Sequence, residues 1–274
     1  MASPFAAQIL SSRAVVRLAG EAPLAFLHNL LTCETADLPP RTWAYGALLS
    51  PQGKIQHDVF VIHDGTNVFI DCALSQRSAL LQKLKLYRLR AKIEIEADEG
   101  SRIAVGSATG LGGDDPRLAS LGQRSIVTTG ALSEGTGYTA TRIAHGLADS
   151  DADIGENALF PHEANLDLVH GVSFTKGCYV GQEVVSRMQH RGTARNRILP
   201  ITGTAALPPK GSEIRSGSTA IGEVLSSVGT EGLALLRLDR LAEATAPLLT
   251  SAVTLTVHKP QWMTLPVTIP DAAA

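Results

Sequence analysis

One cysteine lies where its thiol could take part in chemistry. Cys178 stands in a short loop between Gly177 and Gly181, directly before a pattern that predicts a helix. A thiol near a helix N-terminus and next to a lysine, here Lys176, has two causes for a lowered pKa and therefore for more thiolate at neutral pH. The alternative is that Cys178 is a small buried apolar side chain, which is a common environment of free cysteine.

The helix predicted after this loop is amphipathic. Val184, Val185 and Met188 fall on one helical face. Glu183 and Arg187 form an i,i+4 pair on another face, and an acidic residue in the first turn complements the helix dipole. These residues place a helix directly C-terminal to the cysteine loop.

A basic run follows the predicted helix. It contains His190, Arg191, Arg195 and Arg197, close to an expected domain junction. Guanidinium groups bind both oxygens of a carboxylate or phosphate, and domain junctions are favoured positions for ligand clefts. The alternative is a solvated, positively charged surface.

The composition narrows the classes of protein to consider. The chain has 274 residues with 44% hydrophobic and 18% charged residues, which is typical of a globular protein. Its formal net charge of −2 gives no bulk attraction for nucleic acid or anionic membrane, so we expect neither as a partner. No signal peptide or membrane-spanning run is recognisable. We also expect a monomer.

The three cysteines, Cys33, Cys72 and Cys178, are widely spaced and include no CxxC pair. This pattern argues against a disulfide framework and against a zinc site made of cysteines alone. It is typical of a reducing compartment, and we therefore expect a cytoplasmic protein with no metal site of its own.

The spacing of apolar residues predicts a mixed α+β fold with largely antiparallel sheets, because helical and alternating periods follow one another along the chain. Leu89 is expected on the buried face of the last strand in this part. The expected elements are a strand at residues 13–18, a helix at 23–31, strands at 45–50, 57–65 and 67–72, a helix at 75–87 and a strand at 89–96.

The remaining chain divides into two further parts. Residues 97–155 are expected to form a second, smaller α+β portion, in which residues 111–116 are predicted to be an exposed loop. Short β-prone runs with regular turn signals predict a small β-barrel at the C-terminus. We therefore divide the chain into residues 1–192, which hold both α+β portions, and a barrel at residues 193–274.

The cysteine loop and its helix together resemble the signature of the YgfZ family of folate-binding proteins. Segments 160–165, 171–174 and 49–54, the last followed by Asp58, are also similar to that family, so the resemblance covers essentially the whole chain. The signature has the pattern K-G-C-Y-x-G-Q-E, present here as Lys176, Gly177, Cys178, Tyr179, Gly181, Gln182 and Glu183.

This resemblance implies a fold and a cofactor. The family is similar in fold to the T-protein of the glycine cleavage system, an aminomethyltransferase whose three parts surround folate and whose last part is a small barrel. The implied cofactor is tetrahydrofolate or a derivative of it.

The resemblance also implies roles for individual residues. Glu163 is expected to accept the paired N–H donors of the pterin ring. Asp58 is expected near the reactive folate nitrogen, where a carboxylate can stabilise positive charge or relay a proton. Arg191, Arg195 and Arg197 are candidates for the anionic glutamate tail, with Arg195 preferred.

The function that the resemblance implies is the assembly or repair of iron–sulfur proteins, including one that modifies tRNA. The partners would be iron–sulfur client or assembly proteins. Cys178 would act as a transient cluster or redox contact, or would pair covalently with a partner thiol. One cysteine cannot hold a cubane cluster alone, because such clusters usually need four thiolate ligands.

Two other functions remain open. The first is a folate-dependent aminomethyl- or methyltransferase; His57 next to Asp58, where T-proteins often have two adjacent acids, disfavours it. An accessory factor without classical transferase turnover is therefore preferred, and catalysis is left open. The second is a hydrolase that uses Cys178 with His162 or His190, which would require a base and an oxyanion hole in the right geometry.

Overall fold

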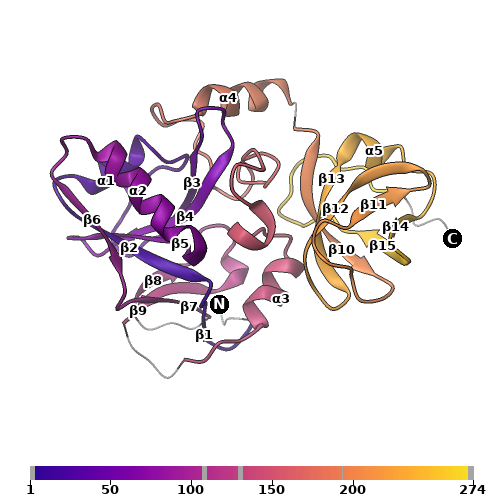
Figure 1. Cartoon of the computed structure of the whole chain (residues 1–274), viewed down its shortest axis with the longest axis horizontal. Helices are drawn as coiled ribbons and strands as arrows, with labels where there is room; N and C mark the ends of the chain where they lie inside the picture. The colour runs from indigo at the N-terminus through magenta and orange to yellow at the C-terminus, as the bar shows by residue number, and fades with distance from the viewer. Residues whose placement is uncertain (1–3, 107–109, 129–131, 193, 271–274) are drawn as a thin grey trace.

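Three antiparallel β-sheets organise the residues that the computed structural model describes, which are 4–106, 110–128, 132–192 and 194–270. Two open sheets come from the N-terminal two thirds of the chain, and a closed barrel follows. Figure 1 shows the barrel beside the two sheets, with helix α4 at the outer edge of the molecule. The predicted α+β class, the antiparallel sheets and the C-terminal barrel are confirmed.

The first sheet has five strands in the order β3-β4-β5-β2-β6. One of its faces forms a core with α1 and α2, and the other contributes to a core shared with the second sheet. Its elements are β2 (Arg13–Gly20), α1 (Pro23–His28), β3 (Ala44–Leu49), β4 (Ile55–His63), β5 (Val68–Ala73), a 3-10 turn (Leu74–Gln76), α2 (Arg77–Arg88) and β6 (Ile93–Asp98).

The strand expected at residues 89–96 begins later than the sequence suggests. Leu89 is 82% exposed and has a positive φ of 48°, so its predicted place on a buried face is wrong. The helical pattern continues to Arg88, whose Nη1 donates a hydrogen bond of 3.0 Å to the carbonyl of Ile93. Residues 89–92 therefore form the turn that connects the end of α2 to the start of β6.

The second sheet has four strands in the order β1-β7-β9-β8. The exposed loop expected at residues 111–116 is wrong, because it contains strand β8 and a buried Asp115 whose charge is paired with Arg117 at 2.9 Å. The elements of this part are β1 (Gln8–Ile9), β7 (Arg102–Gly106), β8 (Leu111–Asp114), a 3-10 turn η2 (Ala119–Leu121), β9 (Gln123–Val127), α3 (Gly137–Ala144) and a π-helical turn η3 (Ser150–Ile154).

Helix α4 (Gln182–Arg191) leads into the barrel, which closes in the order β10-β13-β12-β11-β14-β15 around a core of aliphatic side chains. The division of the chain between residues 192 and 193, and that of the second portion at about 97–155, stay predictions. The barrel elements are β10 (Asn196–Gly203), β11 (Glu213–Ser216), β12 (Thr219–Val228), β13 (Glu231–Arg237), α5 (Leu238–Ala242), β14 (Leu248–Thr250) and β15 (Val253–Val257).

Buried ion pairs join the first two sheets. Asp71 on β5 is fully buried and accepts hydrogen bonds of 2.6 Å from Nε of Arg13 on β2 and 2.6 Å from Nε of Arg124 on β9. The guanidinium of Arg124 also lies 3.9 Å from the ring centroid of Phe60. Because β9 belongs to the other sheet, the ion pairs of Asp71 connect the two sheets.

None of the helices in the described part of the chain is long and apolar enough to cross a membrane.

The first prediction concerns this junction. Asp71→Asn should lower the free energy of unfolding by about 3–5 kcal/mol, because it removes the carboxylate that two buried guanidinium groups contact most closely. Arg124 would keep only its longer pair with Asp115, at 3.8 Å. Urea unfolding followed by circular dichroism measures the change. Arg187→Ala, which removes only the exposed pair with Glu183, serves as the control and should cost less than about 1 kcal/mol. Equal losses in the two variants would contradict this role for Asp71.

Candidate functional site

The cysteine loop is anchored by Lys176. Its ammonium donates to the carbonyl oxygens of His28, Leu31 and Cys33, and the Nζ–O distances to the last two are 2.6 and 3.0 Å. Since an ammonium has three N–H donors, these bonds use all of them. Lys176 therefore fixes the loop to the end of α1, while Cys178 itself is exposed.

The charge of Lys176 influences the buried thiol of Cys33. Burial raises the pKa of Cys33 to about 12, and Lys176 is the largest influence that opposes this rise. The sequence placed Lys176 beside Cys178 as a counter-charge. In the structure the lysine side chain is instead an anchor for the backbone.

The rest of the loop packs along the segment after α1. Tyr179 is buried, its ring centroid lies 5.1 Å from Nζ of Lys176, and burial raises the pKa of its hydroxyl to about 12. Thr32 donates its hydroxyl to the carbonyl of Gly171 at 2.5 Å, and the N–H of Ser173 donates to the carbonyl of Thr32 at 2.8 Å. Hydrogen bonds therefore hold the chain before the exposed Gly177-Cys178 pair, and the buried Tyr179 packs directly after it.

Two glycines bring the signature against the turn between β3 and β4. Gly181 has φ +81°, and a Cβ there would lie 2.7 Å from the carbonyl oxygen of Ser50. Gly53 has φ +80°, and a Cβ there would lie 2.8 Å from Cβ of Val184. Only glycine allows this conformation and this approach together. The contact explains physically why segments 49–54 and 176–183 occur in one sequence pattern.

Helix α4 begins at Gln182, close to the predicted start, and Val185 is its buried apolar residue. Arg187 donates to Glu183 at 2.8 Å, so the expected i,i+4 pair is present on the exposed face. Oε1 of Gln189 lies 3.0 Å from Nε2 of His162, which is buried and whose pKa burial lowers. The hypothesis of a hydrolase that uses Cys178 with His162 or His190 stays a prediction.

Glu163 links its segment to the barrel. Its Oε2 accepts from the N–H of Phe160 at 3.0 Å, and its Oε1 accepts from Nδ2 of Asn196 at 2.8 Å. Its carbonyl accepts from the N–H of Ile198 on β10 at 3.1 Å. A carboxylate offers about four lone pairs, so two remain for donors of a ligand.

The three arginines lie in different environments. Arg197 is buried and pairs through both Nη atoms with Asp167, at 2.6 and 3.0 Å. Its Nε is buried without a hydrogen-bond partner in the described part of the chain. Arg191 and Arg195 are exposed. Of these three arginines, Arg191 and Arg195 therefore have guanidinium groups that an anion can reach from solvent.

Asp58 lies on β4 beneath the π-helical turn η3. It is buried and accepts hydrogen bonds from the hydroxyl of Ser150 and, at 3.4 Å, from the hydroxyl of Tyr45. Burial raises the pKa of the Asp58 carboxyl, and the nearby guanidinium of Arg13 opposes this rise. The pKa of the neighbouring His57 is lowered by burial. Asp58 is thus enclosed by side chains of its own protein.

Sequence reasoning missed the buried charges around Asp58. Arg13 donates to Ser150 at 2.7 Å as well as to Asp71, so the hydroxyl that contacts Asp58 belongs to the same network. A signal existed, because Arg13, Asp71 and Arg124 each interrupt or adjoin an apolar β-prone run. Charged residues at such positions are rarely buried unless they are paired.

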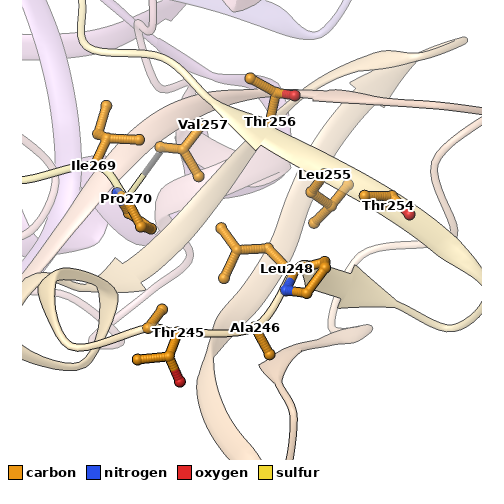
Figure 2. Close-up of a pocket in the computed structure, with 11 residues that line it drawn as sticks. Thr245, Ala246, Leu248, Thr254, Leu255, Thr256, Val257, Ile269 and Pro270 are labelled. Carbon is orange, nitrogen blue, oxygen red and sulfur yellow. The ribbon is translucent and has the colours of Figure 1, made fainter. Parts of the chain in front are cut away.

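One cavity lies at the barrel, away from the predicted site residues. Figure 2 shows residues that line a cavity at the barrel, among them Leu248, Thr256, Val257 and Ile269. The volume of this cavity is about 320 Å³. Its described lining residues include no titratable side chain and none of the predicted site residues. Within the described ranges, no group of three or more His, Cys, Asp or Glu side chains is arranged to hold a metal ion.

Comparison with known proteins finds one matching domain family and several similar proteins. Residues 195–265 match the family described as CAF17, C-terminal beta-barrel domain. The chain is 30% identical over 288 residues to an iron–sulfur cluster assembly factor IBA57 homolog, mitochondrial, of Pyricularia oryzae, covering 87% of this chain and 73% of that protein. It is 30% identical over 275 residues to the human iron–sulfur cluster assembly factor IBA57, mitochondrial, covering 85% of this chain and 77% of that protein.

A solved structure confirms the predicted T-protein-like fold. The crystal structure of glycine cleavage system aminomethyltransferase T from Bartonella henselae superposes with a TM-score of 0.75 at 13% identity. It covers 96% of this chain and 87% of that chain. At this identity the likeness concerns the fold alone.

The expected cytoplasmic location is contradicted by the same comparison, because the fungal and human relatives are named as mitochondrial proteins. The prediction rested on unpaired cysteines. These separate oxidising from reducing compartments, but they do not distinguish one reducing compartment from another.

The second prediction tests the glycine contact. Gly181→Ala should lower the free energy of unfolding by about 1–3 kcal/mol more than Gly192→Ala, because overpacking adds to the strain of a positive φ. Gly192 is a matched control, since it has φ +58° and a Cβ there would meet no atom of the described residues within 4 Å. Urea unfolding gives the free energies, and hydrogen exchange of the α4 amides locates the effect. Similar losses in both variants would show that the contact is unimportant.

Proposed function

Because this chain belongs to the iron–sulfur cluster assembly factor IBA57 family, we propose that it assists the assembly or repair of iron–sulfur proteins. One structural observation carries the proposal. Among the described cysteines, Cys33 and Cys72 are buried, whereas Cys178 is exposed between Lys176, which is held by hydrogen bonds, and Tyr179, which is buried. A fixed, accessible thiol can contact a partner without a large ordering cost.

The partner would be an iron–sulfur client or assembly protein. A cluster usually needs four thiolate ligands, so a cluster contacted by Cys178 would take its other ligands from the partner. Phe174, which is 40% exposed, lies in the same loop and offers an apolar contact beside the thiol. We further propose that tRNA-modifying enzymes are among the clients.

We also propose that tetrahydrofolate or a derivative binds this chain in the YgfZ manner. Glu163 fits the pterin, because its carboxylate is oriented by two bonds from the protein and retains lone pairs for the ligand donors. Arg195 and Arg191 are the candidates for the glutamate tail. Arg197 does not fit that role, since its Nη atoms are paired with Asp167.

Aminomethyl transfer is the alternative function, and the T-protein-like fold supports it. Asp58 disfavours it, because the carboxyl is only 3% exposed and is hydrogen-bonded to hydroxyl groups of the protein. A group that relays protons to folate must be within hydrogen-bond reach of it. Formaldehyde or aminomethyl transfer at useful turnover with purified protein and tetrahydrofolate would favour the transferase.

The third prediction concerns the thiol. Cys178→Ala should strongly reduce the activities of iron–sulfur enzymes in cells whose own family member has been deleted, because the thiol contact is lost. The affinity for tetrahydrofolate should stay unchanged, since Glu163 is held by other residues. Thr175→Ala, an exposed change in the same loop, is the control and should restore enzyme activities fully. Full activity with the Cys178→Ala variant would show that the thiol is dispensable.

The fourth prediction concerns the pterin. Glu163→Gln should weaken tetrahydrofolate binding on the order of 100-fold, because two charge-assisted hydrogen bonds to the carboxylate are weakened or lost. Isothermal titration calorimetry measures the affinity. Glu243→Gln removes one exposed carboxylate from the barrel and serves as the control for the change in charge. An unchanged affinity in Glu163→Gln would place the pterin elsewhere.

A further inference from the structure

A cavity of about 450 Å³ lies where the second sheet region meets the barrel. One wall comes from Ser120 in η2 and His145 at the end of α3, and the other from β10 and residues 258–262. Its volume lies within the range of small-molecule sites, roughly 300–1,000 Å³. The site shares no lining residue with the cysteine loop or with the segment that holds Glu163.

The cavity wall contains one lysine and two histidines and no acidic residue. The lining includes Lys259, His145 and His258, whereas none of its described lining residues is Asp or Glu. None of the ion pairs within the described ranges of the chain involves Lys259. Ser120 adds a hydroxyl, whose Oγ lies 3.4 Å from Nε2 of His145. An unpaired ammonium among imidazole and hydroxyl groups favours an anion.

The ring of His258 is oriented by the barrel. Thr202 donates its hydroxyl to Oε2 of Glu231 at 3.0 Å, and Nε2 of His258 lies 2.9 Å from the same hydroxyl oxygen. A hydroxyl has one hydrogen and a carboxylate only accepts, so Nε2 of His258 is the donor. This bond fixes the ring, and Nδ1 of the neutral imidazole is then an acceptor for a hydroxyl or N–H group of a ligand.

Trp262 supplies a fixed aromatic surface. Its indole Nε1 donates to the carbonyl of His145 at 2.8 Å, and the ring packs against both the shared sheet core and the barrel core. The residue is only partly buried and lines the cavity, so part of its ring surface is left for a ligand. Planar groups stack on such rings.

We propose that this cavity binds a small phosphate ester with a planar ring, of mononucleotide size. Lys259 and Ser120 would donate to the phosphate, Nδ1 of His258 would accept from a hydroxyl group of the ester, and Trp262 would contact the ring. The described lining residues include no arginine, the side chain that matches planar carboxylates bidentately. Point donors from separate elements instead suit a tetrahedral phosphate, for which lysine is a common ligand.

Calorimetry with inorganic phosphate and with adenosine 5′-monophosphate tests the proposal on the full chain. Saturable binding is expected with both, and the nucleotide should bind about tenfold more tightly because its base stacks on Trp262. Lys259→Ala should weaken nucleotide binding about tenfold by removing the ammonium. Lys259 is exposed, so this variant should fold normally, which circular dichroism checks.

Lys85→Ala is the matched control, because Lys85 is an exposed lysine on α2, outside the cavity lining. Its affinity for the nucleotide should equal that of the unaltered chain. The proposal is overturned if neither probe binds saturably, or if the two alanine variants bind equally well. It is also overturned if phosphate binds as tightly as the nucleotide, since the ring would then have no role.

Discussion

The ion pairs of Asp71 with Arg13 and Arg124 are the interaction on which the N-terminal architecture depends. A buried carboxylate between two guanidinium groups is costly to bring out of water, and it is tolerated only when the geometry satisfies every partner. Here β2, β5 and β9 must all be in register for that to occur. The same Arg13 reaches Ser150, whose hydroxyl contacts Asp58. The position of η3 over β4 therefore depends on charges that lie in the sheets below it.

Most residues of the signature around Cys178 hold the loop that carries its thiol. Lys176 uses its ammonium on three backbone carbonyls, and Gly181 allows the backbone to approach Ser50. Tyr179 is buried beneath the lysine. Of these residues, only Cys178 presents a reactive side chain to solvent. A long sequence motif can thus encode one exposed thiol, with most of its residues holding the loop.

The elements were predictable from the sequence where one local period governed them, as in β2, the β3–β4 hairpin, α2 and α4. The sequence failed where a distant partner decides the outcome. Residues 111–116 look polar and loop-like, yet Arg117 neutralises Asp115 and allows it to be buried. Arg197 looks like a free cation, but Asp167, which lies 30 residues earlier, takes its guanidinium. Leu89 looks like a strand residue because its alternation with charged neighbours does not reveal that the helix continues to Arg88.

The proposed folate and thiol sites rest on different parts of the molecule. Glu163 is held by its own segment and by β10 of the barrel, whereas Cys178 is held through Lys176 by the end of α1. Between them lies α4, which contacts the β3–β4 turn at its start and His162 near its end. A ligand at Glu163 would act on the same segment that contains His162. Helix α4 therefore joins the two regions, because it follows the cysteine loop directly and its Gln189 contacts His162.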